Sequence, residues 1–346
     1  MQKKIIALAI AGLASSVAFA QSNVTVYGVA DVGFSHRGDN IAAGVGSRSS
    51  IDSGQRNGSR LGFKGTEALG NGLSAVFVLE TGIAMDNGGF TQGGLAFGRQ
   101  TYAGLSSANI GTVLAGRQYS PQFNLLVNTD PFGLGTVGQN NNVNVNLVPR
   151  LNNLIAYVSP SFGGFNVTAG YTNSAAQNES LDNKGTDNRV WAISPVYNNG
   201  PIMVGLNYHE IKGQVSGLKV KQFDLAGTYD LKMVKLAGAY GKTNMDAANS
   251  SWTASDSKYY MLGATVPVGA AGAVVGSYNY RKADLNSMKA SQWAIGYEHS
   301  LSKRTLAYVY YSDISNKNGA SSETGDAVNG GLGYQNGLQL GMKHSF

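Results

Sequence analysis

The sequence has no cysteine in its 346 residues, which excludes disulfide bonds and metal sites built on thiolates. Charged residues make up only 13% of the chain, about half the share of a typical soluble domain. Beyond the N-terminus, no apolar run approaches the roughly 18 residues that mark a transmembrane helix. These absences argue against a disulfide scaffold, a helical membrane protein and a soluble helical enzyme.

Signals for catalysis and for nucleic-acid binding are also missing. The four histidines, His36, His209, His299 and His344, are scattered without metal-ligand spacing. The chain has no Gly-x-Ser-x-Gly motif, and its net charge of +6 forms no basic stripe. We therefore expect no catalytic residue, no cofactor, no metal site and no nucleic-acid partner. A barrel enzyme would need a Ser/His pair on its external face, and the sequence offers no candidate.

Residues 1–20 have the three parts of a secretory signal peptide. Two lysines precede a short apolar stretch, and the tripeptide Ala18-Phe19-Ala20 provides the small residues of a cleavage site. A membrane anchor is the alternative, although the apolar stretch is shorter than the ~20 residues of a span. We predict export through the periplasm and one mature domain, residues 21–346, with a net charge of +4 after the loss of Lys3 and Lys4.

The chain is rich in glycine, with 47 residues, and in short stretches of alternating polarity. Its end reads GLQLGMKHSF, where Leu338, Leu340, Met342 and Phe346 share one parity. A period of two predicts a strand with one polar and one apolar face. The pattern predicts sixteen strands, near residues 24–35, 58–67, 73–82, 95–105, 112–119, 150–159, 164–173, 188–197, 201–210, 219–229, 233–242, 257–267, 273–282, 290–300, 304–313 and 331–346.

The connections between these strands alternate between short and long. Short turns such as EALGNG at 67–72 alternate with long loops rich in Asn, Ser, Gly and Asp, at 36–57, 83–94, 120–149, 174–187, 243–256 and 314–330. This wiring is typical of a transmembrane β-barrel. A soluble sandwich also alternates, but sixteen half-polar strands require one closed sheet, whose wide lumen holds water. We predict an all-β, 16-stranded antiparallel transmembrane barrel with short periplasmic turns and long external loops, its apolar face toward lipid.

Closure of this barrel requires the last strand to pair with the first. Phe346 would then lie at the periplasmic membrane interface, the level of an aromatic girdle.

Several segments resemble one known family. They are VTVYGVAD at 24–31, SRLGFKGTE at 59–67, FGRQTY at 97–102, GRQY at 116–119 and the terminal Phe346. Together they resemble the general porins of Gram-negative outer membranes, of the Burkholderia, Bordetella and Neisseria type. The resemblance implies a homotrimeric channel for ions and small polar solutes, surrounded by outer-membrane lipids and lipopolysaccharide. It also implies that the third long loop, 120–149, folds into the lumen.

The composition of loop 120–149 fits such a position. It contains one charged residue, Asp130, and seven asparagines. Four apolar side chains are available to pack it against the inner wall, those of Leu125, Leu126, Val127 and Phe132. An ordinary external loop is the alternative. Enteric porins carry Pro-Glu-Phe-Gly-Gly in this loop, whereas here Pro131 is followed directly by Phe132, so the glutamate is missing.

The resemblance further implies arginines on the wall that face acidic residues across the pore constriction. The basic candidates are Arg60, Arg99 and Arg150, with Arg117 as a neighbour, and the acidic candidates are Glu80 on the wall and Asp130 on the loop. An arginine near the lipid midplane costs about 2–4 kcal/mol, which favours the lumen over an external rim for mid-strand arginines. The excess of two positive charges predicts a mild anion preference, weakened at high salt.

Three alternatives remain open from the sequence. A substrate-selective channel would need an ordered track of side chains through the lumen, and a structural or adhesin barrel would have a sealed lumen. Loop carboxylates such as Asp182, Asp187 and Glu323 are either solvated or hold Ca²⁺ at the mouth.

Overall fold

The computed structural model describes residues 23–40, 46–175, 188–213, 218–246, 251, 253–325 and 333–346. The predicted signal peptide lies outside the described residues.

The described chain forms one antiparallel sheet with a short helix inside it. The strands are β1 (Asn23–Asn40), β2 (Arg48–Ser53), β3 (Arg60–Gly70), β4 (Leu73–Gly82), β5 (Gln100–Ser107), β6 (Gly111–Tyr119), β7 (Arg150–Val158), β8 (Phe165–Thr172), β9 (Asn188–Asn199), β10 (Ile202–Gly213), β11 (Lys219–Asp230), β12 (Lys235–Met245), β13 (Ser257–Val268), β14 (Gly272–Ala283), β15 (Lys289–Ser300), β16 (Thr305–Lys317) and β17 (Tyr334–Ser345). The helical segments are α2 (Pro121–Val127), η1 (Asn140–Asn142) and η2 (Leu285–Ser287).

The sheet closes on itself through β1. One edge of β1 pairs with β17, and its other edge pairs with β2 in its second half and with β3 in its first half. Since β2 and β3 share one place beside β1, the seventeen strands fill sixteen positions of a closed barrel. This confirms the predicted 16-stranded barrel. The structure differs from the prediction at β2, which falls within the predicted loop 36–57. Residues 54–59 leave the sheet between β2 and β3, so these two strands together form the second position of the barrel.

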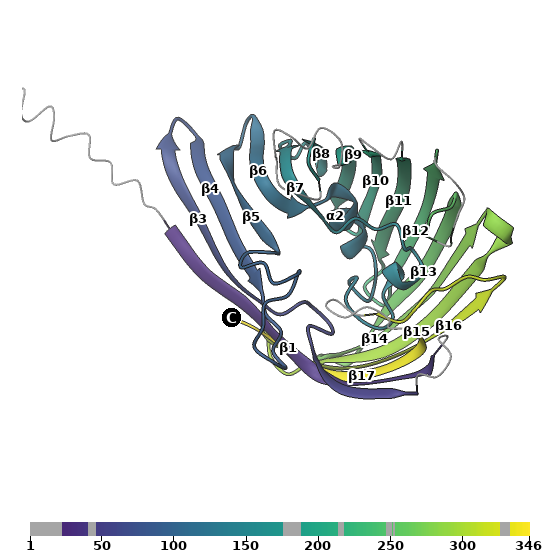
Figure 1. Ribbon diagram of the computed structural model, residues 1–346. Helices are drawn as coiled ribbons and strands as arrows, with labels where there is room; N and C mark the ends of the chain where they lie inside the picture. Colours follow the sequence, from purple (N-terminus) through teal and green to yellow (C-terminus); the bar gives the residue numbers. More distant parts are fainter. Residues whose placement is uncertain are drawn as a thin grey trace, which may run out of the picture.

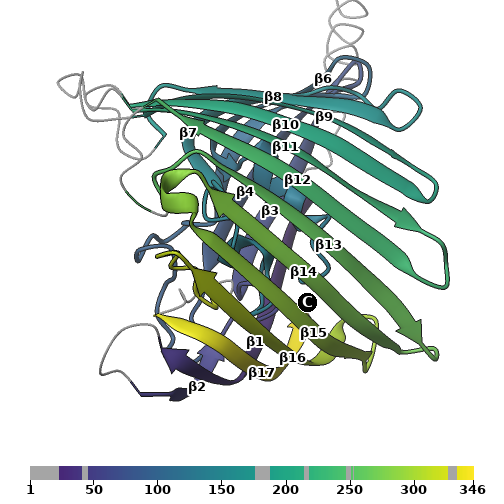
Figure 2. The same ribbon diagram turned by 90° about the vertical axis from the view of Figure 1, so that its right-hand side faces the viewer.

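The strands surround an interior that contains α2 (Figure 1). Seen from the side, β10 to β15 cross the wall diagonally (Figure 2), the tilt that barrel closure requires. No helix in the described part of the chain is long and apolar enough to cross a membrane.

The two faces of the wall differ as the alternation predicts. On β11, Leu225 and Tyr229 are exposed on the outside, whereas Asp224 is buried on the inside. On β17, Leu340 is 47% exposed and Gln339 is fully buried. Exposed apolar residues therefore cover the outer surface, as expected for a face toward lipid, and polar residues line much of the interior.

The C-terminal residue extends the closing pair. The backbone N–H of Phe346 donates to the Gly28 carbonyl at 3.2 Å, and the Gly28 N–H donates to the Phe346 carbonyl at 3.0 Å. A Cβ at position 28 would lie 2.4 Å from the Phe346 ring. Only glycine leaves room for the ring at this point, so the last residue is built into the seam.

Loop 120–149 folds into the barrel, as predicted. Ser120 caps α2 by accepting the Phe123 N–H at 3.0 Å, and Pro121 occupies the first turn, where it needs no N–H partner. The apolar side chains of the loop pack on the inner face of the wall. Leu125, Leu126 and Leu134 contact Ala226, Ala239, Tyr259 and Met261, and Phe132 and Val137 contact Val275, Ala294, Tyr308 and Tyr310.

A polar contact also fixes α2 to the wall. Gln122 donates to Asp224 at 3.1 Å, and Asp224 also accepts from Asn207, Gln222 and Tyr259. The loop thus lies against the wall from β8, beside α2, to β17, where the Val137 N–H donates to the Gln339 side chain at 2.9 Å. The wall of β3 to β7 remains on the other side of the lumen.

Candidate functional site

A cavity of about 280 Å³ separates the inward loop from the wall. Four guanidinium groups reach it, from Arg56, Arg60, Arg99 and Arg150. The loop contributes neutral residues, namely Phe123, Asn124, Val127, Gly133, Leu134, Gly135, Gln139, Asn141, Leu147 and Pro149. Among the described residues, no carboxylate lines this cavity. Its charge is therefore basic on the wall side and neutral on the loop side.

Arg99 and Glu80 form a buried ion pair beside the cavity. Arg99 Nε lies 2.8 Å from Glu80 Oε1, and the residues are 4% and 2% exposed. Tyr27 donates to Glu80 Oε2 at 3.0 Å, and Arg99 Nη2 donates to the Tyr119 hydroxyl at 2.5 Å. Glu80 therefore faces inward as its parity predicts, and its charge is offset by a direct partner.

Arg60 and Arg150 have no such partner. Arg60 Nε donates to the Gly58 carbonyl at 2.9 Å, and the Arg150 guanidinium lies 4.9 Å from the centroid of the Tyr119 ring. In the part of the chain that the structure describes, neither guanidinium lies within 4.0 Å of a carboxylate oxygen. These two arginines carry most of the uncompensated charge of the cavity.

Arg117, predicted as a neighbour of the other three arginines, lies behind the lining of the cavity. It occupies a β-bulge between Gly116 and Gln118, where its Nε donates to the Gly98 carbonyl at 2.8 Å. Its Nη1 donates to the Asn152 side chain. Arg117 is not among the residues that line the arginine cavity.

Asp130 also differs from its expected position. It is 6% exposed, and its carboxylate accepts the backbone N–H groups of Phe132 at 3.0 Å, Asn140 at 2.8 Å and Leu134 at 3.3 Å. Burial raises the pKa of this carboxyl, while those N–H groups and Arg56 oppose the shift. The loop turns sharply around Asp130, so the carboxylate holds the loop together instead of lining the arginine cavity.

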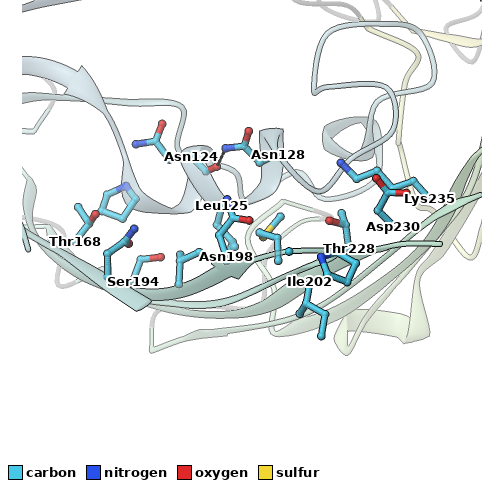
Figure 3. Close-up of a pocket in the computed structure, with 16 residues that line it drawn as sticks. Asn124, Leu125, Asn128, Thr168, Ser194, Asn198, Ile202, Thr228, Asp230 and Lys235 are labelled. Carbon is cyan, nitrogen blue, oxygen red and sulfur yellow. Dashed lines mark hydrogen bonds between the residues drawn. The ribbon is translucent and has the colours of Figure 1, made fainter. Parts of the chain in front are cut away.

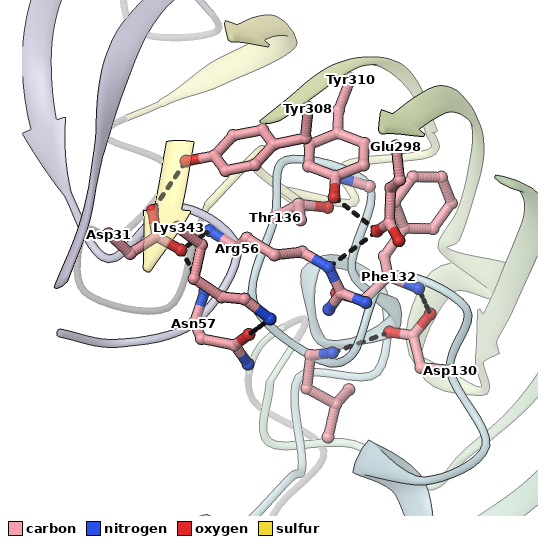
Figure 4. Close-up of polar contacts among 12 residues, drawn as sticks. Asp31, Arg56, Asn57, Asp130, Phe132, Thr136, Glu298, Tyr308, Tyr310 and Lys343 are labelled. Carbon is pink, nitrogen blue, oxygen red and sulfur yellow. Dashed lines mark hydrogen bonds and ion pairs between the residues drawn. The ribbon is translucent and has the colours of Figure 1, made fainter. Parts of the chain in front are cut away.

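The sequence reasoning missed a second basic-acidic pair, formed by Arg56 and Glu298 (Figure 4). Arg56 Nε lies 2.8 Å from Glu298 Oε1, and Arg56 Nη1 donates to the Phe132 carbonyl at 3.1 Å. Tyr310 donates to the same Glu298 oxygen at 2.6 Å. Arg56 thus links the interrupted second position of the wall to both loop 120–149 and β15.

Asp31 holds the segment that carries Arg56. Its Oδ2 accepts the backbone N–H groups of Arg56 at 3.0 Å and Asn57 at 2.7 Å, while Tyr308 donates to Oδ1 at 2.6 Å (Figure 4). A sequence signal existed for Glu298, since it shares its parity with the inward residues Gln292 and Ala294. No periodicity marks Arg56, because it lies outside any strand.

A second cavity of about 450 Å³ lies between α2 and the wall of β8 to β12, at the end with the short turns (Figure 3). Asn124 and Asn128 face it from α2, and Thr168, Ser194 and Asn198 face it from the wall. Its only charged lining residues, among those described, are Asp230 and Lys235. The lining of this cavity is polar and has no net charge, which suits a water-filled vestibule on the short-turn side of the arginine cavity.

The three loop carboxylates considered as calcium ligands are not brought together in the described part of the structure. Asp182 and Asp187 lie outside the described residues, and the Glu323 carboxylate accepts the Gly333 N–H at 2.9 Å. Across the described ranges, no three His, Asp or Glu side chains gather closely enough to hold a metal ion.

Comparisons with known families, proteins and structures all identify porins as relatives of this chain. The family model of the Gram-negative porins matches residues 7–320. Outer membrane porin protein 32 of Delftia acidovorans is 33% identical over the full length of both chains, and an outer membrane porin of Bordetella pertussis is 31% identical, over 91% of this chain and 95% of its own. The solved structure of an anion-selective porin from Comamonas acidovorans has a TM-score of 0.77 at 32% identity, covering 94% of this chain and 100% of that one. These relatives are channel proteins, and the chain belongs to the Gram-negative porin family of the outer membrane.

Proposed function

We propose that this porin lets ions and small hydrophilic solutes diffuse through a constriction that favours anions, set by Arg56, Arg60, Arg99 and Arg150. The observation that supports it is the arginine cavity, which four guanidinium groups and no described carboxylate line. Rings of arginine or lysine favour anions in water-filled pores. The similarity to a solved porin named as anion-selective points in the same direction.

The charge balance makes this preference mild. Arg99 is paired with Glu80 and Arg56 with Glu298, so two of the four arginines are offset locally. Counting Arg56 and Glu298 in place of Arg117 and Asp130, which do not line the cavity, leaves the same excess of two positive charges that the sequence predicts. Arginine remains ionised at any physiological pH, so the excess persists even though the guanidinium groups are close together.

Passage of a solute follows from this geometry. The loop face is neutral and polar or apolar, and the opposite face is basic, so the field points across the narrow gap. A hydrated anion or a polar solute exchanges water for guanidinium and amide contacts, whereas a bulky apolar solute loses water without compensation. We further propose a homotrimer surrounded by outer-membrane lipid, which rests on membership of the porin family.

The deciding experiment is single-channel recording of the refolded protein in a planar bilayer under a KCl gradient. We expect large current steps, closure in thirds for a trimer, and a reversal potential of anion-selective sign. The preference should shrink at 1 M salt, where the screening length falls to about 3 Å. A cation-selective sign would overturn the assignment of the arginines.

Two other outcomes would replace the proposed function. Saturable block of the current by one solute class at micromolar concentration would indicate a substrate-selective channel. No current from a barrel that shows the usual heat-modifiable mobility would indicate a sealed lumen, and hence a structural or adhesin role.

A further inference from the structure

The vestibule, the space of about 450 Å³ between α2 and the wall of β8 to β12, is lined by polar side chains that the protein itself does not use. Within the described residues, several of these side chains make no hydrogen bond, namely those of Asn124 on α2, Asn166 and Thr168 on β8, Asn198 on β9 and Thr228 on β11. Amide and hydroxyl groups in such a place bind water or the polar groups of a solute.

These groups surround the space from two sides. On the wall, Asn198 pairs with Met203 of β10, which in turn pairs with Thr228, so all three point into the lumen. Strands lie about 4.8 Å apart, which places the backbones of Asn198 and Thr228 about 10 Å from each other. Thr168 faces the same space from β8, and Asn124 faces it from the helix opposite (Figure 3). A solute between them would meet hydrogen-bonding groups around its edge.

The middle of the vestibule is apolar. Leu125, Val196 and Met203 contribute hydrocarbon side chains to its lining. A Cβ at Gly205 would lie 2.7 Å from Leu125 Cδ1 and 2.9 Å from Val196 Cγ2, so glycine lets α2 and the wall come together at this point. The lining therefore combines an apolar surface with polar groups around it. A ring that carries C–H groups on its face and hydroxyl groups on its rim has the matching pattern.

The vestibule carries no net charge. Its charged lining residues, among those described, are Asp230 and Lys235, which pair across β11 and β12 at the short-turn end. Their opposite charges offset each other at one edge. An ion would lose water here without gaining a counter-charge, whereas an uncharged solute would not. Asn124 also lines the arginine cavity, so a solute that passes the constriction reaches the vestibule next.

We propose that the vestibule binds an uncharged polyhydroxylated solute, of the class of monosaccharides and cyclic polyols, through Asn124, Asn166, Thr168, Asn198 and Thr228. Each amide has two N–H donors and an oxygen acceptor, so it can donate to one hydroxyl group and accept from another. The ring of the solute lies over the apolar middle of the vestibule. The volume falls within the range of about 300–1,000 Å³ that is typical of small-molecule sites.

This inference deepens the proposed function and rests on its open lumen. It adds a saturable binding step for neutral solutes to the passive diffusion of ions. The two steps use different groups, since the arginine cavity acts on charge and the vestibule acts on hydroxyl groups. They can therefore be tested separately.

The test measures binding of D-glucose to the refolded, detergent-solubilised porin by saturation-transfer difference NMR, titrated through the millimolar range. We expect saturable binding to wild type and at least about tenfold weaker binding to N198A/T228V, because two hydrogen-bonding groups are lost. The matched control is T66V/N109A, which changes the same residue types at exposed short-turn positions outside the vestibule and should bind as wild type does. Triethylene glycol, a neutral solute with few hydroxyl groups, should bind much more weakly than glucose.

Heat-modifiable mobility and unchanged single-channel conductance verify that N198A/T228V is folded, since neither residue lines the arginine cavity. Thr168→Val is a second variant, in case the first does not fold, and should weaken glucose binding severalfold. Wild-type affinity in a folded variant would overturn the proposal, as would a lack of saturable glucose binding to wild type or equal binding of triethylene glycol.

The result separates this inference from the proposed channel function. An anion-selective channel that does not bind glucose would count against the vestibule site alone. A folded barrel that binds glucose but passes no current would count against the proposed function alone.

Discussion

Arg99 and Glu80 lie 2.8 Å apart, Nε to Oε1, in a pair that is almost closed to water. A backbone hydrogen bond from the Arg99 N–H to the Glu80 carbonyl, 3.1 Å long, adds to it. The pair joins the last residues of β4 to the segment that leads into β5, so the residue that supplies charge to the cavity also fixes its wall. This double role sets what substitution at either position should do.

We predict that Glu80→Gln makes the channel more anion-selective. The substitution leaves the Arg99 charge without its carboxylate, so the reversal potential in a KCl gradient should move further in the anion direction. It also breaks a buried ion pair, which costs about 3–5 kcal/mol in comparable cases, so the barrel should unfold at a lower temperature. Glu67→Gln, at an exposed position on the short-turn end of β3, is the control. A shift toward cations would contradict the prediction.

The double substitution Arg60→Gln with Arg150→Gln should remove most of the anion preference. Among the described residues, these are the cavity arginines without a carboxylate oxygen within 4.0 Å, so they contribute most to the excess charge. The effect should be large at 0.1 M KCl, where the screening length is about 10 Å, and small at 1 M, where it is about 3 Å.

Arg117→Gln is the matched control for that pair. The Arg117 guanidinium binds the Gly98 carbonyl and the Asn152 side chain and does not line the cavity, so its removal should change the reversal potential much less than the double substitution does. If Arg117→Gln reduced selectivity as much as the double substitution, the assignment of the cavity as the selective constriction would be wrong.

Asp130→Asn should loosen the inward loop with little effect on selectivity. The carboxylate accepts three backbone N–H groups, and an amide oxygen accepts fewer of them, so part of the loop loses its partners. We expect greater noise in the open-channel current and faster proteolysis within residues 120–149. Asp86→Asn, at an exposed loop position, should behave as wild type. A quiet channel with a strongly changed reversal potential would show that Asp130 faces the ion path.

Gly28→Ala should impair closure of the barrel. A methyl group there would lie 2.4 Å from the Phe346 ring and 2.7 Å from the Arg60 carbonyl, so the terminal residue would have to move. We expect a lower yield of heat-modifiable, folded protein in detergent refolding. Gly46→Ala is the control, because nothing lies within 4 Å of a Cβ at that position. Equal yields for the two variants would show that the contact at the seam is dispensable.

The wall of this barrel was predictable because each strand carries its own local signal. The alternation on 73–82 coincides with β4, and the prediction of 257–267 differs from β13 by one residue. The pattern failed at β2, where Arg48 to Ser53 is short and polar and the following residues leave the sheet. That strand forms by backbone pairing with β1, and the local periodicity of a sequence does not reveal which strands pair.

The constriction was predictable only in part, for a related reason. Glu80 and Arg60 could be placed from parity because they lie at regular strand positions. Arg56 and Asp130 lie in irregular segments, where the position of a side chain depends on contacts from distant parts of the chain. The Asp31 carboxylate turns Arg56 inward, and the backbone around Asp130 folds back on the carboxylate. Neither contact has a sequence spacing that could reveal it.

The seam between β1 and β17 also has a temporal consequence. Val29 pairs with Ser345, so β1, the first strand to be synthesised, has one unpaired edge until β17, the last strand, is available to pair with it. Contacts between such distant residues are slow to form, because a long loop of chain must first be closed. Until then the chain has two open strand edges, which are prone to join other chains. The chain must therefore be kept apart from its copies until β1 has paired with β17.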